Sequence, residues 1–229
     1  SFSPGNVPNE RVVAYYERRA KNEVGLILTE GTCVGHKASN GYPNVPYIYG
    51  EAALAGWKKV VEAVHAQGGK MAPQLWHVGM MRNPAKTTNP DDASVGPSGV
   101  LKPGKVAGQP LSDAEIKQII TAFADAAAHA HKMGFDGVEL HGAHGYLLDQ
   151  FFWDATNLRD DAWGGDLPQR TRFAVEIIKA VRAATAPDFP IMLRYSQWKQ
   201  QDFEHKIAPT PDELAAFLKP LSDAGVDMF

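Results

Sequence analysis

Residues 135–146 read Phe-Asp-Gly-Val-Glu-Leu-His-Gly-Ala-His-Gly-Tyr, and the predicted fold is built outward from this stretch. The apolar run 135–140 predicts a buried strand, and His141, His144 and Tyr146 follow it directly. In folds with parallel sheets, ligands bind at the carboxyl ends of the strands. The stretch therefore indicates three hydrogen-bonding side chains at the ligand-binding edge of an α/β sheet.

On either side of this strand, helical and strand-like segments alternate along the chain. Helices are predicted at 11–24, 51–67, 112–134, 169–184 and 210–225, and strands at 25–30, 70–76, 135–140, 190–195 and 226–229. Two capping boxes, Ser112 with Glu115 and Thr210 with Glu213, mark helix starts, because their side chains satisfy exposed backbone donors. Continuous apolar strands joined by crossover helices predict a parallel sheet.

Periodicity leaves two architectures open, a doubly wound sheet or a (β/α)8 barrel that lacks pieces. Five strands cannot close an eight-stranded barrel. The sequence starts on a loop and helix and ends within a strand-like segment, so both ends look cut. Residues 78–111 are rich in Pro, Gly, Ser and Asn and predict a long loop, which in a compact domain is usually functional.

The composition excludes several classes of protein. The formal net charge is -3 and no Lys/Arg-rich run occurs, which argues against nucleic-acid or anionic-membrane partners. No apolar stretch approaches the roughly 20 residues of a membrane span, and residues 1–6 do not resemble a signal peptide. The single cysteine, Cys33, excludes an internal disulfide framework. We expect a cytoplasmic protein with one domain over residues 1–229.

Polar residues also end the other predicted strands. They are Glu30 and Thr32 on the first, Gln74 and His77 on the second, and Arg194 and Ser196 on the fourth. Any one of them could simply satisfy loop carbonyls. Their recurrence on successive strands predicts a convergent polar rim at one edge of the sheet.

The histidine pair admits two chemical interpretations. With Glu139, which shares a strand face with His141, the pair could bind a metal in a TIM-barrel hydrolase or lyase, although zinc sites usually need a further well-placed ligand. Alternatively, His141 and His144 donate hydrogen bonds to a ligand oxygen. Tyr146 is then a plausible proton donor, because a phenol keeps its proton until a strong base develops beside it.

The segment 141–176 resembles the signature of the Old Yellow Enzyme family, the FMN-dependent ene-reductases. The matching residues are His141, His144, Gly145, Tyr146, Leu147, Asn157, Arg159, Gly164, Gly165, Arg172, Phe173 and Glu176. Residues 29–32, 74–79 and 193–194 also fall in family order. The resemblance therefore covers essentially the whole chain.

This resemblance implies a TIM barrel that binds FMN without a covalent link at its carboxyl-terminal rim. Gln74 resembles the glutamine that hydrogen-bonds the flavin pyrimidine edge, and Gly31 the small residue against the isoalloxazine. Arg194 resembles the arginine near flavin N1 and O2, where a positive charge favours the anionic reduced flavin. His141 is also expected to contact the cofactor.

For the substrate, the resemblance implies that His141 and His144 hold a carbonyl oxygen and that Tyr146 protonates the α-carbon. The reductant is NADH or NADPH, and flavin N5 passes hydride to the β-carbon of an enone-type small molecule.

The family pattern also implies an incomplete barrel. Its first strand would precede Ser1, and its last two strand–helix units would follow Phe229. Met80 and Trp163 depart from the family, which usually has arginine and tyrosine at these positions. The remaining alternative is a non-catalytic fragment whose open sheet edges pair with another chain, which would give a homo-oligomer.

Overall fold

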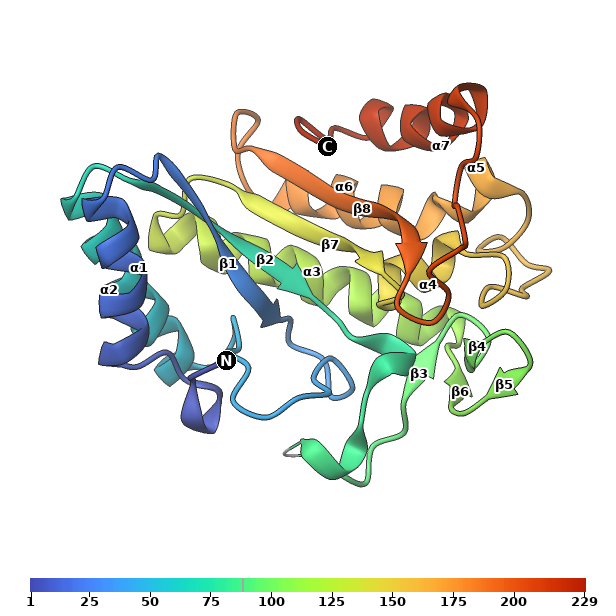
Figure 1. Ribbon diagram of the computed structural model, residues 1–229, viewed down its shortest axis with the longest axis horizontal. Helices are drawn as coiled ribbons and strands as arrows, with labels where there is room; N and C mark the ends of the chain where they lie inside the picture. The colour runs from blue at the N-terminus through green and yellow to red at the C-terminus, as the bar shows by residue number, and fades with distance from the viewer. Residues whose placement is uncertain (88) are drawn as a thin grey trace.

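A curved parallel sheet forms the centre of the computed structural model, which describes residues 1–87 and 89–229 (Figure 1). Its strands are β1 (Leu26–Cys33), β2 (Lys70–Trp76), β7 (Val138–His144) and β8 (Ile191–Lys199). All neighbouring pairs are parallel, and the order across the sheet is the order along the chain. A doubly wound sheet would reverse its strand order part-way across. The sheet is therefore part of a barrel wall.

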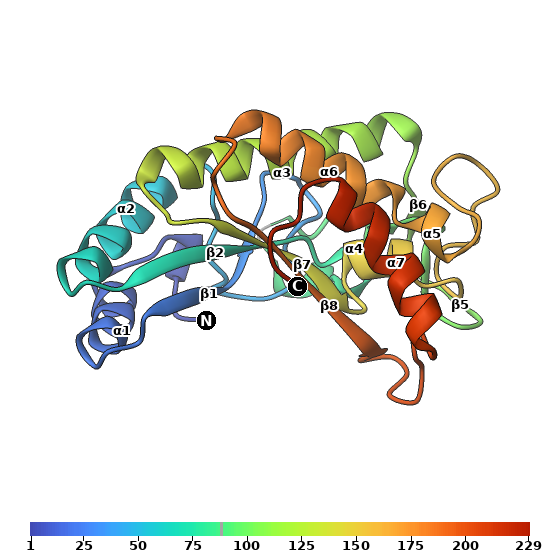
Figure 2. The same ribbon diagram turned by 90° about the horizontal axis from the view of Figure 1, so that it is seen from above.

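The helices form a single belt along this wall. They are α1 (Glu10–Lys21), α2 (Glu51–Ala66), α3 (Asp113–Met133), α4 (Leu147–Phe152), α5 (Leu167–Arg170), α6 (Arg172–Ala184) and α7 (Pro211–Asp223). The long helices α1, α2, α3, α6 and α7 each contact the next one in chain order. Figure 2 shows α2, α3 and α6 together on one side of the sheet. This arrangement matches the outer ring of a (β/α)8 barrel.

The predicted elements form with shifted boundaries. The first helix ends at Lys21 and not near residue 24, because Glu23 adopts a left-handed φ of 67° that a helix cannot continue through. The predicted helix 169–184 is divided at Thr171 into α5 and α6, and the short α4 was not predicted. The fifth predicted strand is represented by a parallel bridge between Met192 and Met228.

Residues 78–111 contain more regular structure than the loop prediction allowed. They form the 3-10 helices η2 (Gly79–Met81) and η3 (Pro84–Lys86) and the strands β3 (Val95–Gly96), β4 (Val100–Lys102), β5 (Lys105–Val106) and β6 (Gln109–Pro110). The strands pair as β3 with β6 and β4 with β5. A further 3-10 helix, η1 (Pro4–Asn6), precedes α1. Thr88 lies outside the described residues.

A bulge in β1 compensates for Pro73 in the middle of β2. Proline has no N–H to donate to a sheet ladder, so it is rare in a strand with neighbours on both sides. The β1–β2 register shifts between Leu28 and Gly31. Inside this shift, the Thr29 hydroxyl accepts the backbone N–H of Gln74 at 2.9 Å. The bulge places Gly31 directly opposite Gln74.

The two faces of the sheet have different roles. The alternate residues Val138, Leu140, Ile191 and Leu193 are 0–1% exposed and belong to the hydrophobic core that also contains α3 and α6 residues. Because successive strand side chains point to opposite faces, the residues between them project away from the helices. That second face carries the polar side chains of the candidate site.

The first strand, β1, is an edge of the sheet in the described part of the chain, and Leu26 on it is 45% exposed. An open strand edge is a template for pairing with another chain. Self-association stays a prediction. Among the described residues, no helix is both long enough and apolar enough to cross a membrane.

We expect Ser112→Ala to lower the free energy of unfolding by about 1 kcal/mol. Ser112 and Glu115 form the complete capping box at the start of α3, so alanine leaves an N-terminal donor of the helix unsatisfied. Urea unfolding followed by circular dichroism measures the change. Ser112→Thr, which keeps the hydroxyl, is the control, and equal losses in both variants would contradict the capping role.

Candidate active site

Two rows of side chains cross the sheet on the face that points away from the helices. In the first row the register aligns Gly31 with Gln74, Gln74 with Glu139 and Glu139 with Met192. The Gln74 amide donates from Nε2 to Glu139 Oε1 at 2.5 Å. Glu139 is buried, and this hydrogen bond compensates part of the cost of removing its carboxylate from water.

The second row contains Trp76, His141 and Arg194. His141 and Arg194 are register partners across the β7–β8 ladder. The Trp76 and His141 rings are nearly parallel, with centroids 6.1 Å apart. Arg194 is exposed, and none of the described residues forms an ion pair or side-chain hydrogen bond with its guanidinium. It is therefore available to an anionic or polar ligand beside His141.

A left-handed turn after His141 returns the chain toward this second row. His144 and Gly145 have φ angles of 64° and 83°. Within the turn, the His144 ring lies 5.5 Å and the Tyr146 ring 5.1 Å from the His141 ring, centroid to centroid. The three side chains singled out in the sequence thus lie around one point.

Burial keeps His141 uncharged. Removal from water, together with the smaller effects of the neighbouring His144 and Arg194, lowers its pKa to about 3. The pKa of His144 is also lowered, first by burial and then by the charges of Arg194 and Lys199. A neutral imidazole has one N–H donor and one acceptor nitrogen. The buried Nδ1 of His141 has no hydrogen-bond partner among the described residues.

Aromatic and amide groups surround the Tyr146 hydroxyl. It lies 3.3 Å from the Tyr42 hydroxyl, and Gln200 Nε2 donates to it at 3.4 Å. Tyr42 also stacks on Trp76 at 5.5 Å, and Trp76 meets the Tyr146 ring edge-on at 4.9 Å. Burial raises the pKa of Tyr42, so its phenol remains protonated.

Gly31 is required for the close approach of Trp76. A Cβ at this position would lie 2.5 Å from the indole ring. Gly31, Tyr42, Trp76 and Tyr146 all border a cavity of about 490 Å³. Tyr146, which borders this cavity, has its ring 5.1 Å from the His141 ring, centroid to centroid, and the cavity is large enough for a small organic molecule.

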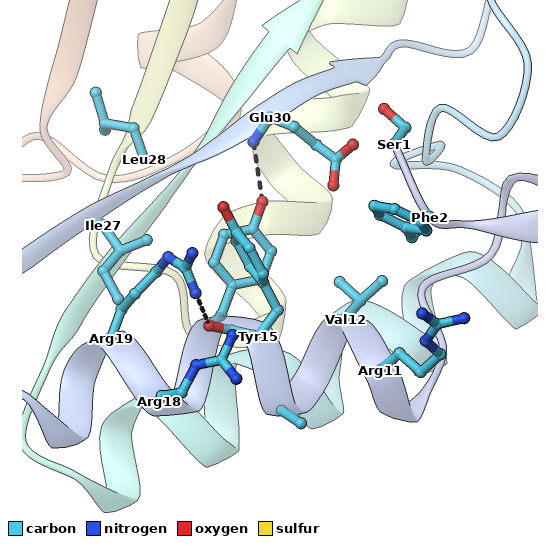
Figure 3. A pocket seen from close by; sticks show the side chains of 12 residues that line it. Ser1, Phe2, Arg11, Val12, Tyr15, Arg18, Arg19, Ile27, Leu28 and Glu30 are labelled. Carbon is cyan, nitrogen blue, oxygen red and sulfur yellow. Dashed lines mark hydrogen bonds between the residues drawn. The ribbon is translucent and has the colours of Figure 1, made fainter.

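A second, larger hollow of about 710 Å³ lies between α1 and β1 (Figure 3). Phe2, Arg18, Arg19 and Glu30 are among the side chains that line it. The backbone N–H of Glu30 donates to the Tyr16 hydroxyl at 3.0 Å, one of the bonds drawn in the figure. This hollow flanks the open edge of β1, and Tyr146, which borders the smaller cavity, does not line it. We therefore place the candidate site at His141 and His144.

Sequence reasoning assigned no site role to Tyr42, Trp76, Trp198 or Gln200. Trp76 follows Gln74 by two positions in the same strand, so the period of two would have placed it on the same face. Trp198 stacks on His144 at 4.8 Å. Tyr42 and Gln200 lie in loops, and no local sequence pattern encodes the path of a loop.

The metal interpretation finds no support in this geometry. The described part of the chain contains no cluster of three His, Cys, Asp or Glu side chains that could hold a metal ion. Glu139 shares the face of His141 as predicted, but its carboxylate is bound by Gln74.

Comparison with known proteins agrees with the arrangement of the site. A sequence model of the NADH:flavin oxidoreductase / NADH oxidase family matches residues 1–228. The chain belongs to this family. The Old Yellow Enzyme homologue of Zymomonas mobilis superposes with a TM-score of 0.86 at 31% identity, over 99% of this chain and 65% of that one. The family resemblance and the incomplete TIM barrel are thereby confirmed.

Two curated relatives of this chain are informative. An NADP-dependent oxidoreductase of Aspergillus flavus is 40% identical over 86% of this chain and 52% of its own length. A putative 12-oxophytodienoate reductase of Oryza sativa subsp. japonica is 43% identical over 79% of this chain and 49% of its own. The chain spans about half the length of the curated relatives it matches.

We expect His141→Gln to make stability less sensitive to acid. Because the folded-state pKa of His141 lies well below its unfolded value near 6.5, only the unfolded chain gains this proton as pH falls from 7 to 5. The imidazole should therefore cost the native state about 2 kcal/mol over this range. Urea unfolding of both proteins at pH 7 and pH 5 measures the difference. An identical pH dependence in wild type and variant would show that His141 is not held neutral.

Proposed function

We propose that this chain forms the substrate-activating part of an FMN-dependent ene-reductase, with residues 1–229 as one flavin-binding barrel domain. The proposal rests on the close approach of the His141, His144 and Tyr146 rings. They lie beside Arg194, whose guanidinium has no side-chain partner among the described residues. A bound FMN would supply redox chemistry, taking hydride from NADH or NADPH and giving it to an α,β-unsaturated carbonyl compound.

The chain offers suitable groups for a flavin. Arg194 is exposed and without a partner in the described chain, so its guanidinium would hold an anionic edge of the ring system and stabilise charge that develops there on reduction. Gln74 is partly exposed and presents an amide of mixed donor and acceptor character. Gly31 borders the cavity beside Trp76, whose indole fills the space of a Cβ at this position, and the Gly31 backbone would lie beside a bound flavin. His141 would complete the contacts beside Arg194.

The histidines would polarise the substrate. Neutral His141 and His144 each keep one N–H donor, and two donors aimed at a carbonyl oxygen draw electron density from the conjugated alkene. The buried Nδ1 atom of His141 has no hydrogen-bond partner among the described residues. A buried polar atom of this kind is unusual unless a ligand or water satisfies it.

Tyr146 would give its proton to the α-carbon. Tyr146 borders the cavity, and its hydroxyl is contacted by the Tyr42 hydroxyl and the Gln200 amide, which would fix its direction. These neighbours can hydrogen-bond the phenolate oxygen that remains after transfer. The oxophytodienoate reductase and the NADP-dependent oxidoreductase among the relatives support reduction of a small molecule with a nicotinamide donor.

We expect the full-length protein to purify as a yellow flavoprotein whose absorbance bleaches with NADH or NADPH and returns on addition of cyclohex-2-enone. A visible spectrum without a flavin band after reconstitution with FMN would exclude the proposal. So would a flavin that is reduced by nicotinamide but is not reoxidised by the enone under anaerobic conditions.

Tyr146→Phe should slow enone reduction by roughly 10²- to 10⁴-fold, the usual contribution of a general acid. Flavin reduction by the nicotinamide needs no proton on carbon and should remain close to wild type. Anaerobic stopped-flow absorbance separates the two half-reactions. Tyr15→Phe, on the exposed face of α1, is the matched control. Equal losses in both half-reactions of Tyr146→Phe would refute the role of Tyr146 as acid.

A further inference from the structure

A fully buried ion pair lies behind the turn that carries the proposed catalytic side chains. Lys199, at the end of β8, and Asp149, in α4, both have completely buried side chains. Lys199 Nζ donates to Asp149 Oδ1 at 2.7 Å and to the Ser196 carbonyl at 3.2 Å. No part of the proposed reaction uses either group directly.

The second carboxylate oxygen of Asp149 holds the turn itself. Asp149 Oδ2 accepts the backbone N–H of Gly145 at 2.7 Å. The Gly145 carbonyl accepts from Gln150 Nε2 at 2.6 Å and from Gln201 Nε2 at 3.2 Å. Side chains therefore bind both polar groups of the residue that lies between His144 and Tyr146.

Lys199 is connected to His144 as well. The two residues are partners in the β7–β8 register, after a shift in the ladder. The backbone N–H of His144 donates to the Ser196 hydroxyl at 2.9 Å, and the backbone carbonyl of Ser196 accepts from Lys199 Nζ. Trp198, next to Lys199, stacks on the His144 ring. The end of β8 thus supports the turn from the side opposite to α4.

Energetics favour a positioning role over a purely stabilising one. Removing two charges from water costs several kcal/mol each, and apolar replacement of buried pairs is often neutral or stabilising. Burial accordingly raises the pKa of Asp149 to about 6, against the opposing charge of Lys199. The turn has positive φ at His144, a conformation that a non-glycine residue keeps only when its surroundings hold it.

We propose that Asp149 and Lys199 are positioning residues that fix the Gly145 peptide and thereby aim the Tyr146 hydroxyl and the His144 ring at the substrate. The inference rests on the proposed function, but it makes a separate structural claim about the turn. Misplacement of a catalytic group by about 1 Å can cost on the order of 10²-fold in rate.

Lys199→Met in the FMN-loaded full-length protein should slow reoxidation of the reduced flavin by cyclohex-2-enone by roughly 10- to 100-fold. The decisive comparison is Lys199→Met in the Tyr146→Phe background. If Lys199 acts through Tyr146, Lys199→Met should slow enone reduction much less in the Tyr146→Phe background than in wild type. The reason is that the effects of two residues that act through a shared partner are not additive. Full multiplication of the two effects would overturn the proposal.

Two further variants separate positioning from folding. Ile178→Ala, in the core of α6 away from the turn, loses stability by leaving a cavity and should keep the wild-type enone rate. Asp149→Leu with Lys199→Met removes both charges, so it leaves no uncompensated buried ion, and it should be as slow as Lys199→Met. A double variant with the wild-type rate would overturn the proposal.

Hydrogen exchange gives a test that does not depend on catalysis. In Lys199→Met, the backbone amides of residues 143–147 should exchange faster than in wild type, while those of β2 stay protected. Unchanged protection of the turn would refute the positioning claim even if the enzyme reduces enones. Faster exchange in a protein without enone activity would refute the proposed function and leave the claim about the turn standing.

Discussion

The parallel ladder around β7 is the constraint on which the site depends. Backbone hydrogen bonds fix β7 between β2 and β8, and their register places Gln74 opposite Glu139 and His141 opposite Arg194. A slip of one residue would turn every one of these side chains toward the helices. The apolar alternates such as Leu140 prevent that slip, because they would lose their burial in the core. Packing of the apolar side chains on one face of the sheet thus determines which side chains lie on the other face.

Burial governs the charge state of the site. Burial lowers the pKa of His141, so its imidazole is neutral and carries one N–H donor. Two fully buried charged side chains, Lys199 and Asp149, are paired and lie behind the turn. Arg194 lies exposed in the second row, apart from this buried pair.

Local signals in the sequence were sufficient for most helices. The capping boxes at Ser112 and Thr210 form as predicted, since they involve residues three positions apart. The choice between a barrel and a doubly wound sheet depended on strand order, which joins segments far apart in the chain, such as Gln74 and Glu139, 65 residues apart. Hydrophobic periodicity depends only on residues close together in the sequence, so it could not distinguish a barrel from a doubly wound sheet. The family resemblance supplied the barrel, and the strand order agrees with it.

The sequence by itself determined where the four strands of the main sheet lie, that His141, His144 and Tyr146 follow one apolar run, and that the motif belongs to a flavin oxidoreductase family. Only the tertiary structure decided what surrounds them. Trp76 against Gly31 and the Lys199–Asp149 pair behind Gly145 join residues distant in the chain. Burial and charge pairing are properties of three-dimensional neighbours, so no spacing in the sequence could reveal them.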